Sequence, residues 1–157
     1  MRGKGRAAAV VAIAVLAVVI YGLANANISA FPAPGPVETW LATGARDWLI
    51  ARAAKRIPPA DVPLNADSVS KGKALYGMAC ASCHGRTGLK PSPIGQAMYT
   101  RATNLASPIV QRLSDGELYW VIANGVRLTG MPGFANIDTT RQIWRLVYYV
   151  RSLRGDR

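Results

Sequence analysis

The cysteines and the histidine of this sequence all lie in one pentapeptide, Cys80-Ala81-Ser82-Cys83-His84. The chain of 157 residues contains two cysteines and one histidine, so this segment holds the complete set. Cysteines three positions apart on a helical turn project to the same side, where both can bond the two vinyl groups of one haem. The adjacent histidine can then bind the iron. The spacing predicts that Cys80, Cys83 and His84 attach and ligate one covalent haem c.

Three other uses of a CxxC pair are disfavoured by the rest of the sequence. A structural zinc site needs four ligands, and this chain has too few Cys and His residues to supply them. A thioredoxin-like dithiol expects a βαβ context, and no stretch of the sequence alternates with the period of a strand. A single short disulfide could not hold a domain together either. Haem attachment is therefore the favoured chemistry.

Iron in such a site takes one more protein ligand, and a second histidine does not exist in the chain. Met1 lies at the N-terminus, and Met78 is two residues before Cys80, on the wrong side of the haem. Met131 lies in Thr129-Gly130-Met131-Pro132-Gly133, where glycine and proline favour a tight bend that presents the thioether inward. We therefore expect His84 and Met131 as the two iron ligands, with Met98 or an open position as alternatives. The alternative role for each methionine is that of an apolar side chain that packs in the core.

Helices are the elements that must position these ligands. A helical pattern begins at about Asp67 and runs into the haem motif, and the segment from Gly85 to Pro108 has the glycines and prolines of an irregular loop. Two capping boxes, Ser114 with Glu117 and Thr139 with Gln142, open two further helices. The first of these ends at Asn124-Gly125. The second buries its apolar stripe and places Trp144 and Tyr148 one turn apart. These observations predict an all-α domain over residues 67–157.

The residues before this domain divide into three parts. Residues 1–6 are a basic segment, and residues 7–28 are an apolar run that is long enough to cross a membrane. The positive-inside rule keeps the basic end cytoplasmic and exports the rest. Ala24-Asn25-Ala26 also fits a signal-peptide cleavage site, so a transmembrane anchor and a cleaved signal peptide both remain open. Residues 29–66 contain a proline-rich linker and a basic amphipathic helix over Val37–Arg56, which could lie on a membrane surface, dock on a neighbouring subunit or pack on its own domain.

The formal charge of +11 is the remaining clue to partners. Three basic residues precede the apolar run and all 8 acidic residues follow it, which leaves an excess of +8 in the rest of the chain. The basic residues are scattered and no nucleic-acid recognition motif accompanies them, so we expect no nucleic-acid partner. The excess instead favours acidic docking faces on protein partners or an anionic membrane surface.

Residues from about Asp67 to Arg154 resemble a class I c-type cytochrome. The residues that carry the resemblance are Gly72, Tyr76, the Cys80–His84 motif, Pro93-Ile94-Gly95, Gly130-Met131-Pro132, Trp144 and Tyr148. The resemblance implies a small all-α fold around one haem, in which the first and last helices cross and a glycine lets an aromatic residue approach. It also implies that Pro93 backs His84 through its carbonyl or the local turn. The anchor and the tryptophan-containing helix depart from the basic family pattern.

The side chains expected around the haem edge are Tyr99, Arg101 and Trp120, because each carries a donor that could serve a propionate. With both axial positions of the iron filled, no small-molecule substrate can bind there. We expect a membrane-anchored, periplasmic-side electron carrier rather than an enzyme, working with respiratory or photosynthetic redox proteins and touching lipid through its N-terminal helix. The alternatives are a cleaved soluble carrier, a sensor or enzyme with an open iron site, and a purely structural haem protein.

Overall fold

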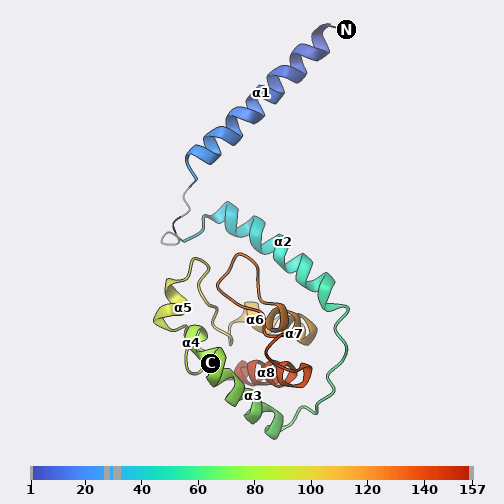
Figure 1. Ribbon diagram of the computed structural model, residues 1–157, viewed down its shortest axis with the longest axis vertical. Helices are drawn as coiled ribbons and strands as arrows, with labels where there is room; N and C mark the ends of the chain where they lie inside the picture. Colours follow the sequence, from blue (N-terminus) through green and yellow to red (C-terminus); the bar gives the residue numbers. More distant parts are fainter. Residues whose placement is uncertain (1, 27–28, 30–32, 156–157) are drawn as a thin grey trace. The chain divides into compact units, whose positions relative to one another are not determined.

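The structure, a computed structural model, describes residues 2–26, 29 and 33–155. Within these residues all regular elements are helices, which confirms the predicted all-α class (Figure 1). The chain divides into two units, residues 1–30 and 31–157. The haem motif and the other candidate site residues all belong to the second unit.

The first unit is built around α1 (Arg2–Ala24). Its stretch Gly5–Ala24 is long and apolar enough to cross a membrane, as judged by length and composition. A signal sequence would satisfy the same criterion, so both sequence-based alternatives stand. The end of the predicted anchor, at residues 27–28, and Met1 lie outside the described residues.

The second unit begins with α2 (Pro36–Ala54), which the sequence predicted to within two residues at each end. Pro36 stands in the first turn, where its missing N–H costs nothing. The helix packs on α7 (Asp115–Asn124) and buries Ile50, whereas Trp40 and Trp48 stay exposed. The packing of α2 on its own domain is thus one of the three alternatives that the sequence left open.

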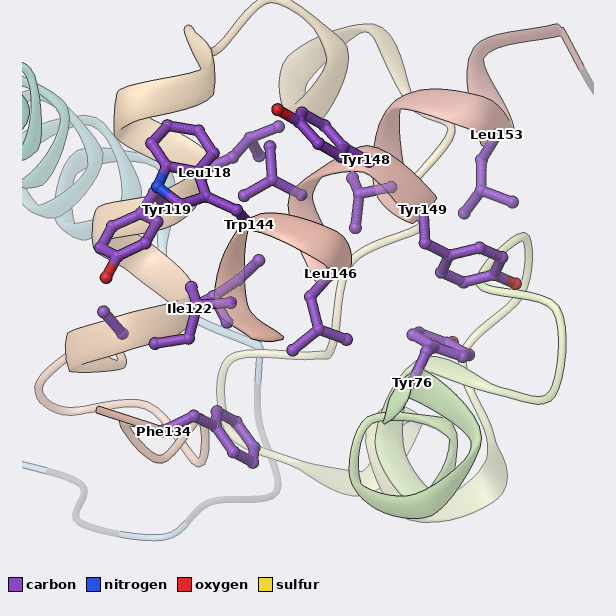
Figure 2. Close-up of a cluster of buried hydrophobic side chains, with 14 of the residues drawn as sticks. Tyr76, Leu118, Tyr119, Ile122, Phe134, Trp144, Leu146, Tyr148, Tyr149 and Leu153 are labelled. Atoms are coloured by element: carbon purple, nitrogen blue, oxygen red, sulfur yellow. The ribbon is translucent and has the colours of Figure 1, made fainter. Parts of the chain in front are cut away.

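The crossing of α3 (Ala66–Ala79) with α8 (Thr140–Ser152) is the centre of the fold. Gly72 permits it, because a Cβ atom at this position would lie 2.0 Å from the carbonyl oxygen of Arg145. One turn on, the ring of Tyr76 packs against that of Tyr149 with 4.9 Å between centroids (Figure 2). The sequence prediction of Trp144 and Tyr148 as the aromatic residues of this crossing was therefore wrong in register.

Trp144 and Tyr148 face a different neighbour. The Trp144 ring lies 4.8 Å from that of Tyr119 on α7, and 6.4 Å from Tyr148 (Figure 2). The Tyr148 hydroxyl donates a hydrogen bond to the carbonyl of Val62, 3.0 Å away. Since α8 is buried almost all round, one of its faces meets α3 and another meets α7, and sequence periodicity alone could not assign the faces.

Both predicted capping boxes are present. Ser114 and Glu117 satisfy each other's backbone N–H groups at the start of α7, as Thr139 and Gln142 do at the start of α8. The segment expected to be an irregular loop is more ordered than predicted. After α4 (Ala81–His84) it contains α5 (Pro93–Ala97) and leads into α6 (Pro108–Gln111). A short 3₁₀ turn, η1 (Leu153–Gly155), follows α8.

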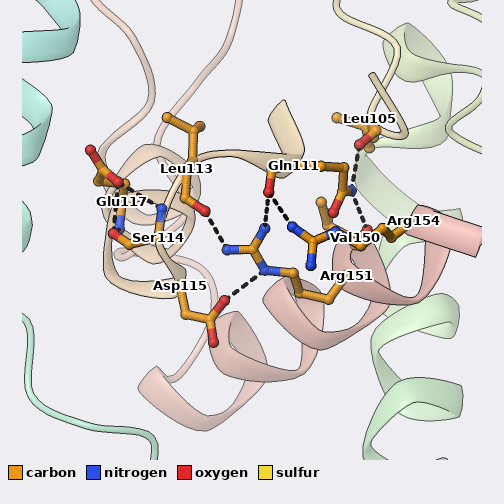
Figure 3. Close-up of polar contacts among 9 residues, drawn as sticks. All are labelled: Leu105, Gln111, Leu113, Ser114, Asp115, Glu117, Val150, Arg151 and Arg154. Atoms are coloured by element: carbon orange, nitrogen blue, oxygen red, sulfur yellow. Dashed lines mark hydrogen bonds and ion pairs between the residues drawn. The ribbon is translucent and has the colours of Figure 1, made fainter. Parts of the chain in front are cut away.

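A polar junction fixes α6 and the start of α7 to the end of α8 (Figure 3). Buried Gln111 donates from Nε2 to the carbonyls of Leu105 (2.7 Å) and Val150 (2.9 Å). The Arg151 guanidinium donates to Asp115 (2.6 Å) and to the carbonyls of Gln111 (3.0 Å) and Leu113. Leu105, Leu113 and Val150 also line the cavity described below, so this junction holds one wall of the site in place.

Candidate functional site

A cavity of about 440 Å³ lies within the second unit. Most of its wall is apolar, and Leu118, Ile122 and Phe134 of the buried cluster contribute to it. Cys80, Cys83, His84, Met98 and Met131 all line this same cavity. Segments up to about 50 residues apart in the sequence therefore bring sulfur and nitrogen ligands to one apolar chamber. These dimensions and this lining suit an apolar ligand of considerable size.

The two cysteines and the histidine are held on one helical turn. Cys80 ends α3, and its carbonyl accepts hydrogen bonds from the amides of Cys83 (3.2 Å) and His84 (2.9 Å). Burial first, with Asp138 and Cys83 adding to it, raises the pKa of the Cys80 thiol to about 11. A redox-active dithiol needs the opposite, a thiol with a lowered pKa. The described residues also contain no group of three or more His, Cys, Asp and Glu side chains that could hold a metal ion by themselves.

The His84 ring is oriented by a backbone carbonyl. Its Nδ1 lies 3.0 Å from the carbonyl oxygen of Thr103. Because a carbonyl can only accept, Nδ1 carries the proton and Nε2 keeps its lone pair for a metal. We expected Pro93 to back His84 through its carbonyl or through the local turn. The first alternative is wrong, because the carbonyl that meets the His84 ring is that of Thr103. Pro93 is exposed and starts α5, outside the cavity wall.

Met131 lies on a loop that folds back against the end of α7. Gly125 caps that helix with a positive φ of 68°, and a Cβ atom there would come within 2.5 Å of the Met131 carbonyl oxygen. The Val126 amide donates to this same carbonyl (3.3 Å), and the Met131 amide donates to the Thr129 hydroxyl (3.1 Å). Gly125 thus lets the loop close tightly and bring Met131 to the cavity.

Met98 lies in the cavity wall as well, directly after α5. A Cβ atom built on Gly130 would lie 3.0 Å from the Met98 sulfur, so Met98 packs against the residue that precedes Met131. The structure therefore brings both candidate methionines to the same region of the wall. The preference for Met131 over Met98 as the iron ligand still rests on the sequence, because glycine and proline flank Met131 and favour a tight bend there.

The three residues expected near the propionates separate in the structure. Arg101 lines the cavity, whereas Trp120 and Tyr99 do not contribute to its wall. The Tyr99 hydroxyl instead donates to the Glu38 carboxylate on α2, and this hydrogen bond raises the pKa of Tyr99. Tyr99 therefore ties the loop before Arg101 to the N-terminal part of α2.

Two kinds of site residue escaped sequence reasoning. Thr100 lines the cavity, and its buried hydroxyl oxygen has no hydrogen-bond partner in the part of the chain that the structure describes. Three residues of α2, namely Arg46, Asp47 and Ile50, also reach the cavity wall. No local signal marks Thr100, but Arg46 and Ile50 are four apart and so share a helix face.

The lining residues fit haem c. The two thiols can form thioethers with its vinyl groups, while the His84 imidazole and a methionine sulfur can bind its iron. The orphaned Thr100 hydroxyl gives an acceptor-bearing group of the ligand a donor that the protein itself does not use. The apolar wall suits the macrocycle.

Comparisons with known proteins differ in what they show. No curated protein matches the chain. A solved structure, a chain of the reducing HAO-like protein complex of Kuenenia stuttgartiensis, is similar with 22% sequence identity and a TM-score of 0.39. The match covers 62% of the present chain and 51% of that one, so the chain spans about half the length of this relative.

The family comparison is more informative. The family model described as "Cytochrome C oxidase, cbb3-type, subunit III" matches residues 67–150, which is more than half of the chain and includes the haem motif and Met131. The cytochrome c domain of this family implies covalent haem c and electron transfer. The chain therefore belongs to this family and is a class I c-type cytochrome.

Proposed function

We propose that the protein is a membrane-tethered monohaem c-type cytochrome that passes single electrons between redox partners, as a subunit of a membrane redox complex. The observation that carries this proposal is the meeting of Cys80, Cys83, His84 and Met131 at one cavity. Haem c bound there supplies the one-electron couple. The chain's own residues attach the cofactor, orient it and exclude water from it.

His84 and Met131 are the proposed axial ligands. The Thr103 carbonyl keeps the proton on Nδ1 and so leaves Nε2 free to bind. With a thioether as the second ligand beside the imidazole, haem would have a higher reduction potential than with a second histidine. With both of these residues bound to it, the iron would serve electron transfer and would leave no coordination position for a substrate. A sensor or enzyme with an open iron site would require both Met131 and Met98 to stay away from the iron.

The assignment of Met131 is tested in the purified holoprotein with Met131→Ala and, as its matched control, Met98→Ala. We expect Met131→Ala to keep haem covalently attached, to lose the weak sulfur-to-iron charge-transfer band of the oxidised protein and to bind carbon monoxide when reduced. The reduction potential should fall. Met98→Ala should keep the band and the potential.

The reverse result, loss of the band only in Met98→Ala, would transfer the ligand role to Met98. A wild-type protein without the band that binds carbon monoxide readily would favour the sensor or enzyme. A holoprotein with both ligands in place whose haem lies too far from every neighbouring cofactor for transfer would favour a structural haem.

Two observations, one on α1 and one on α2, support the tether and the complex. The stretch Gly5–Ala24 can span a bilayer by length and composition. In this proposal the basic segment 1–6 is cytoplasmic and the haem domain 67–157 lies on the periplasmic side. A tether over residues 7–28 raises the effective concentration of the haem domain for other membrane redox proteins. Trp40 and Trp48 are 73% and 63% exposed on α2, within the segment 29–66, and a freely diffusing carrier has little need of such a surface.

The competing proposal is a soluble periplasmic carrier released by cleavage after Ala26. We expect the intact mass of the purified chain to include residues 1–26 and the protein to need detergent for extraction. A mass that corresponds to a chain beginning at residue 27 would exclude the tether. It would not contradict the proposed haem site. Respiratory and photosynthetic partners are distinguished by what co-purifies in mild detergent.

A further inference from the structure

We propose that α2, which lies outside the family domain, closes the haem cavity and that its Arg46 pairs with a haem propionate. The neighbouring Asp47 has the opposite effect on the reduction potential of the haem. The helix lies before residues 67–150, the part that matches the family. The inference rests on the haem site proposed above but not on the identity of the axial ligands. It assigns Arg46 and Asp47 as residues that set the reduction potential.

The contacts of α2 fix which of its faces meets the cavity. Ile50 is 4% exposed, and Arg46, Asp47 and Ile50 all belong to the cavity wall. Towards its C-terminal end, Ala54 approaches Gly116 of α7, where a Cβ atom would lie 3.3 Å from the Ala54 carbonyl oxygen. Near the N-terminal end, Glu38 accepts the hydrogen bond from Tyr99. The helix is therefore attached at both ends, with Arg46 between the two attachments.

The chemistry of haem places its propionates toward α2. The vinyl groups that bond the cysteines and the two propionates lie on opposite edges of the macrocycle. Figure 1 shows α4, which carries Cys83, and α2 on different sides of the second unit, and the cavity wall includes residues of both. A haem bonded at Cys80 and Cys83 and extending across the cavity would therefore present its propionate edge to the residues that α2 contributes to the wall.

The charged side chains on the α2 side of the cavity are only partly complementary to the two propionate carboxylates of a haem. Arg46 and Arg101 are the basic side chains of the cavity wall apart from His84, and the Thr100 hydroxyl is a buried donor without a partner among the described residues. Asp47 is the acidic side chain of the same wall and binds Arg46, with 2.7 Å between Nη2 and Oδ1. Both side chains of that pair are well exposed, at 37% and 51%, so the pair itself contributes little stability.

A guanidinium is suited to bridge two acceptors, because its five N–H groups form a rigid fork. Arg46 can therefore donate to a propionate while it keeps one bond to Asp47. A cation held at the haem edge favours the reduced state, which carries one positive charge fewer than the oxidised state. The Asp47 carboxylate has the opposite influence. Arg46 and Asp47 therefore have effects of opposite sign on the potential.

The test is the midpoint potential of the full-length holoprotein in detergent, measured by redox titration of the haem absorption. We expect Arg46→Gln to lower the potential, so that the ratio of reduced to oxidised protein at a fixed applied potential falls roughly three- to tenfold, the size of the effect of one nearby charge that solvent screens strongly. Asp47→Asn should shift it upward. Arg46→Lys keeps the charge and should stay closer to the wild type than Arg46→Gln.

The matched control is Arg52→Gln on the same helix. Arg52 is exposed, lies over the ring of Trp48 at 5.7 Å and does not line the cavity, so its loss should leave the potential unchanged. Equal potentials for Arg46→Gln and Arg52→Gln would overturn the proposal, as would a downward shift in Asp47→Asn. If the Arg46→Gln protein does not acquire haem, the proposal is tested by the midpoint potentials of Asp47→Asn and Arg46→Lys alone.

The outcome can be separated from that of the ligand assignment. The sulfur-to-iron band and carbon monoxide binding report on Met131 and Met98, and neither depends on Arg46. A protein whose band is absent can still show opposite shifts for Arg46→Gln and Asp47→Asn, which would retain this proposal while the assignment of the axial methionine failed.

Discussion

The crossing of α3 with α8 and the packing of α2 both enclose the haem cavity, but they are built in different ways. At the crossing the backbones meet at Gly72, and Tyr76 and Val147 are 2% and 0% exposed. On α2 the buried side chain is Ile50, and Trp40 and Trp48 remain exposed to solvent. The contact between α3 and α8 is close-packed and has no room for an added atom, whereas α2 packs on the outside of the helices that form the core.

The largest effect that this comparison predicts is that of Gly72→Ala. The added Cβ would stand 2.0 Å from the Arg145 carbonyl oxygen, so α3 and α8 must move apart and the Tyr76–Tyr149 contact must open. Overpacking of this kind at the centre of a domain should cost about 3 kcal/mol or more, a large part of the roughly 5–15 kcal/mol of a typical domain. Chemical denaturation of the holoprotein, followed by far-ultraviolet circular dichroism, measures it.

Gly44→Ala on α2 is the matched control for this substitution. A Cβ atom at Gly44 meets nothing within 4 Å, and alanine favours an exposed helix interior by about 0.5–1 kcal/mol over glycine. The same chemical change should therefore leave the global stability unchanged or slightly raised. Equal destabilisation by both substitutions would show that α2 belongs to the close-packed core and would remove the distinction drawn above.

Local structure and contacts across the fold differ in how much the sequence reveals. The local signals of Ser114 with Glu117, of Thr139 with Gln142 and of the helix before Cys80 were all readable, because a cap needs only neighbours three residues away. The all-α class followed from them. The approach of Met131 to the cavity also followed from local turn chemistry, since Gly130 and Gly133 permit a tight bend and Pro132 fixes part of its backbone.

Contacts across the fold were not readable in the same way. Tyr149 rather than Trp144 or Tyr148 meets α3, because α8 is apolar on several faces and its rotation is decided by what packs on each. The Thr103 carbonyl that orients His84 is 19 residues away and carries no side-chain signal. The part of α2 in the cavity wall depends on packing against α7, a helix about 70 residues later in the chain.

A smaller effect, confined to α2, is predicted for Ile50→Ala. Its side chain is 4% exposed, so truncation should weaken the docking of the helix by roughly 2 kcal/mol, within the range for partly collapsible apolar sites. Since α3, α7 and α8 keep their contacts, the loss should appear as local opening of α2 rather than as unfolding of the domain. Tryptic cleavage after Arg52 in the folded holoprotein reports such opening.

Leu49→Ala is the control, because the neighbouring Leu49 side chain is 55% exposed and its loss removes little packing. We expect faster cleavage in Ile50→Ala, a wild-type rate in Leu49→Ala, and retained haem absorption in both. If Ile50→Ala instead unfolds the whole domain, α2 is part of the core on which the haem site depends. If neither variant is cleaved faster, Ile50 is not needed to keep α2 docked on the domain. The contacts of Glu38 and Ala54 then suffice to keep Arg46 at the cavity wall.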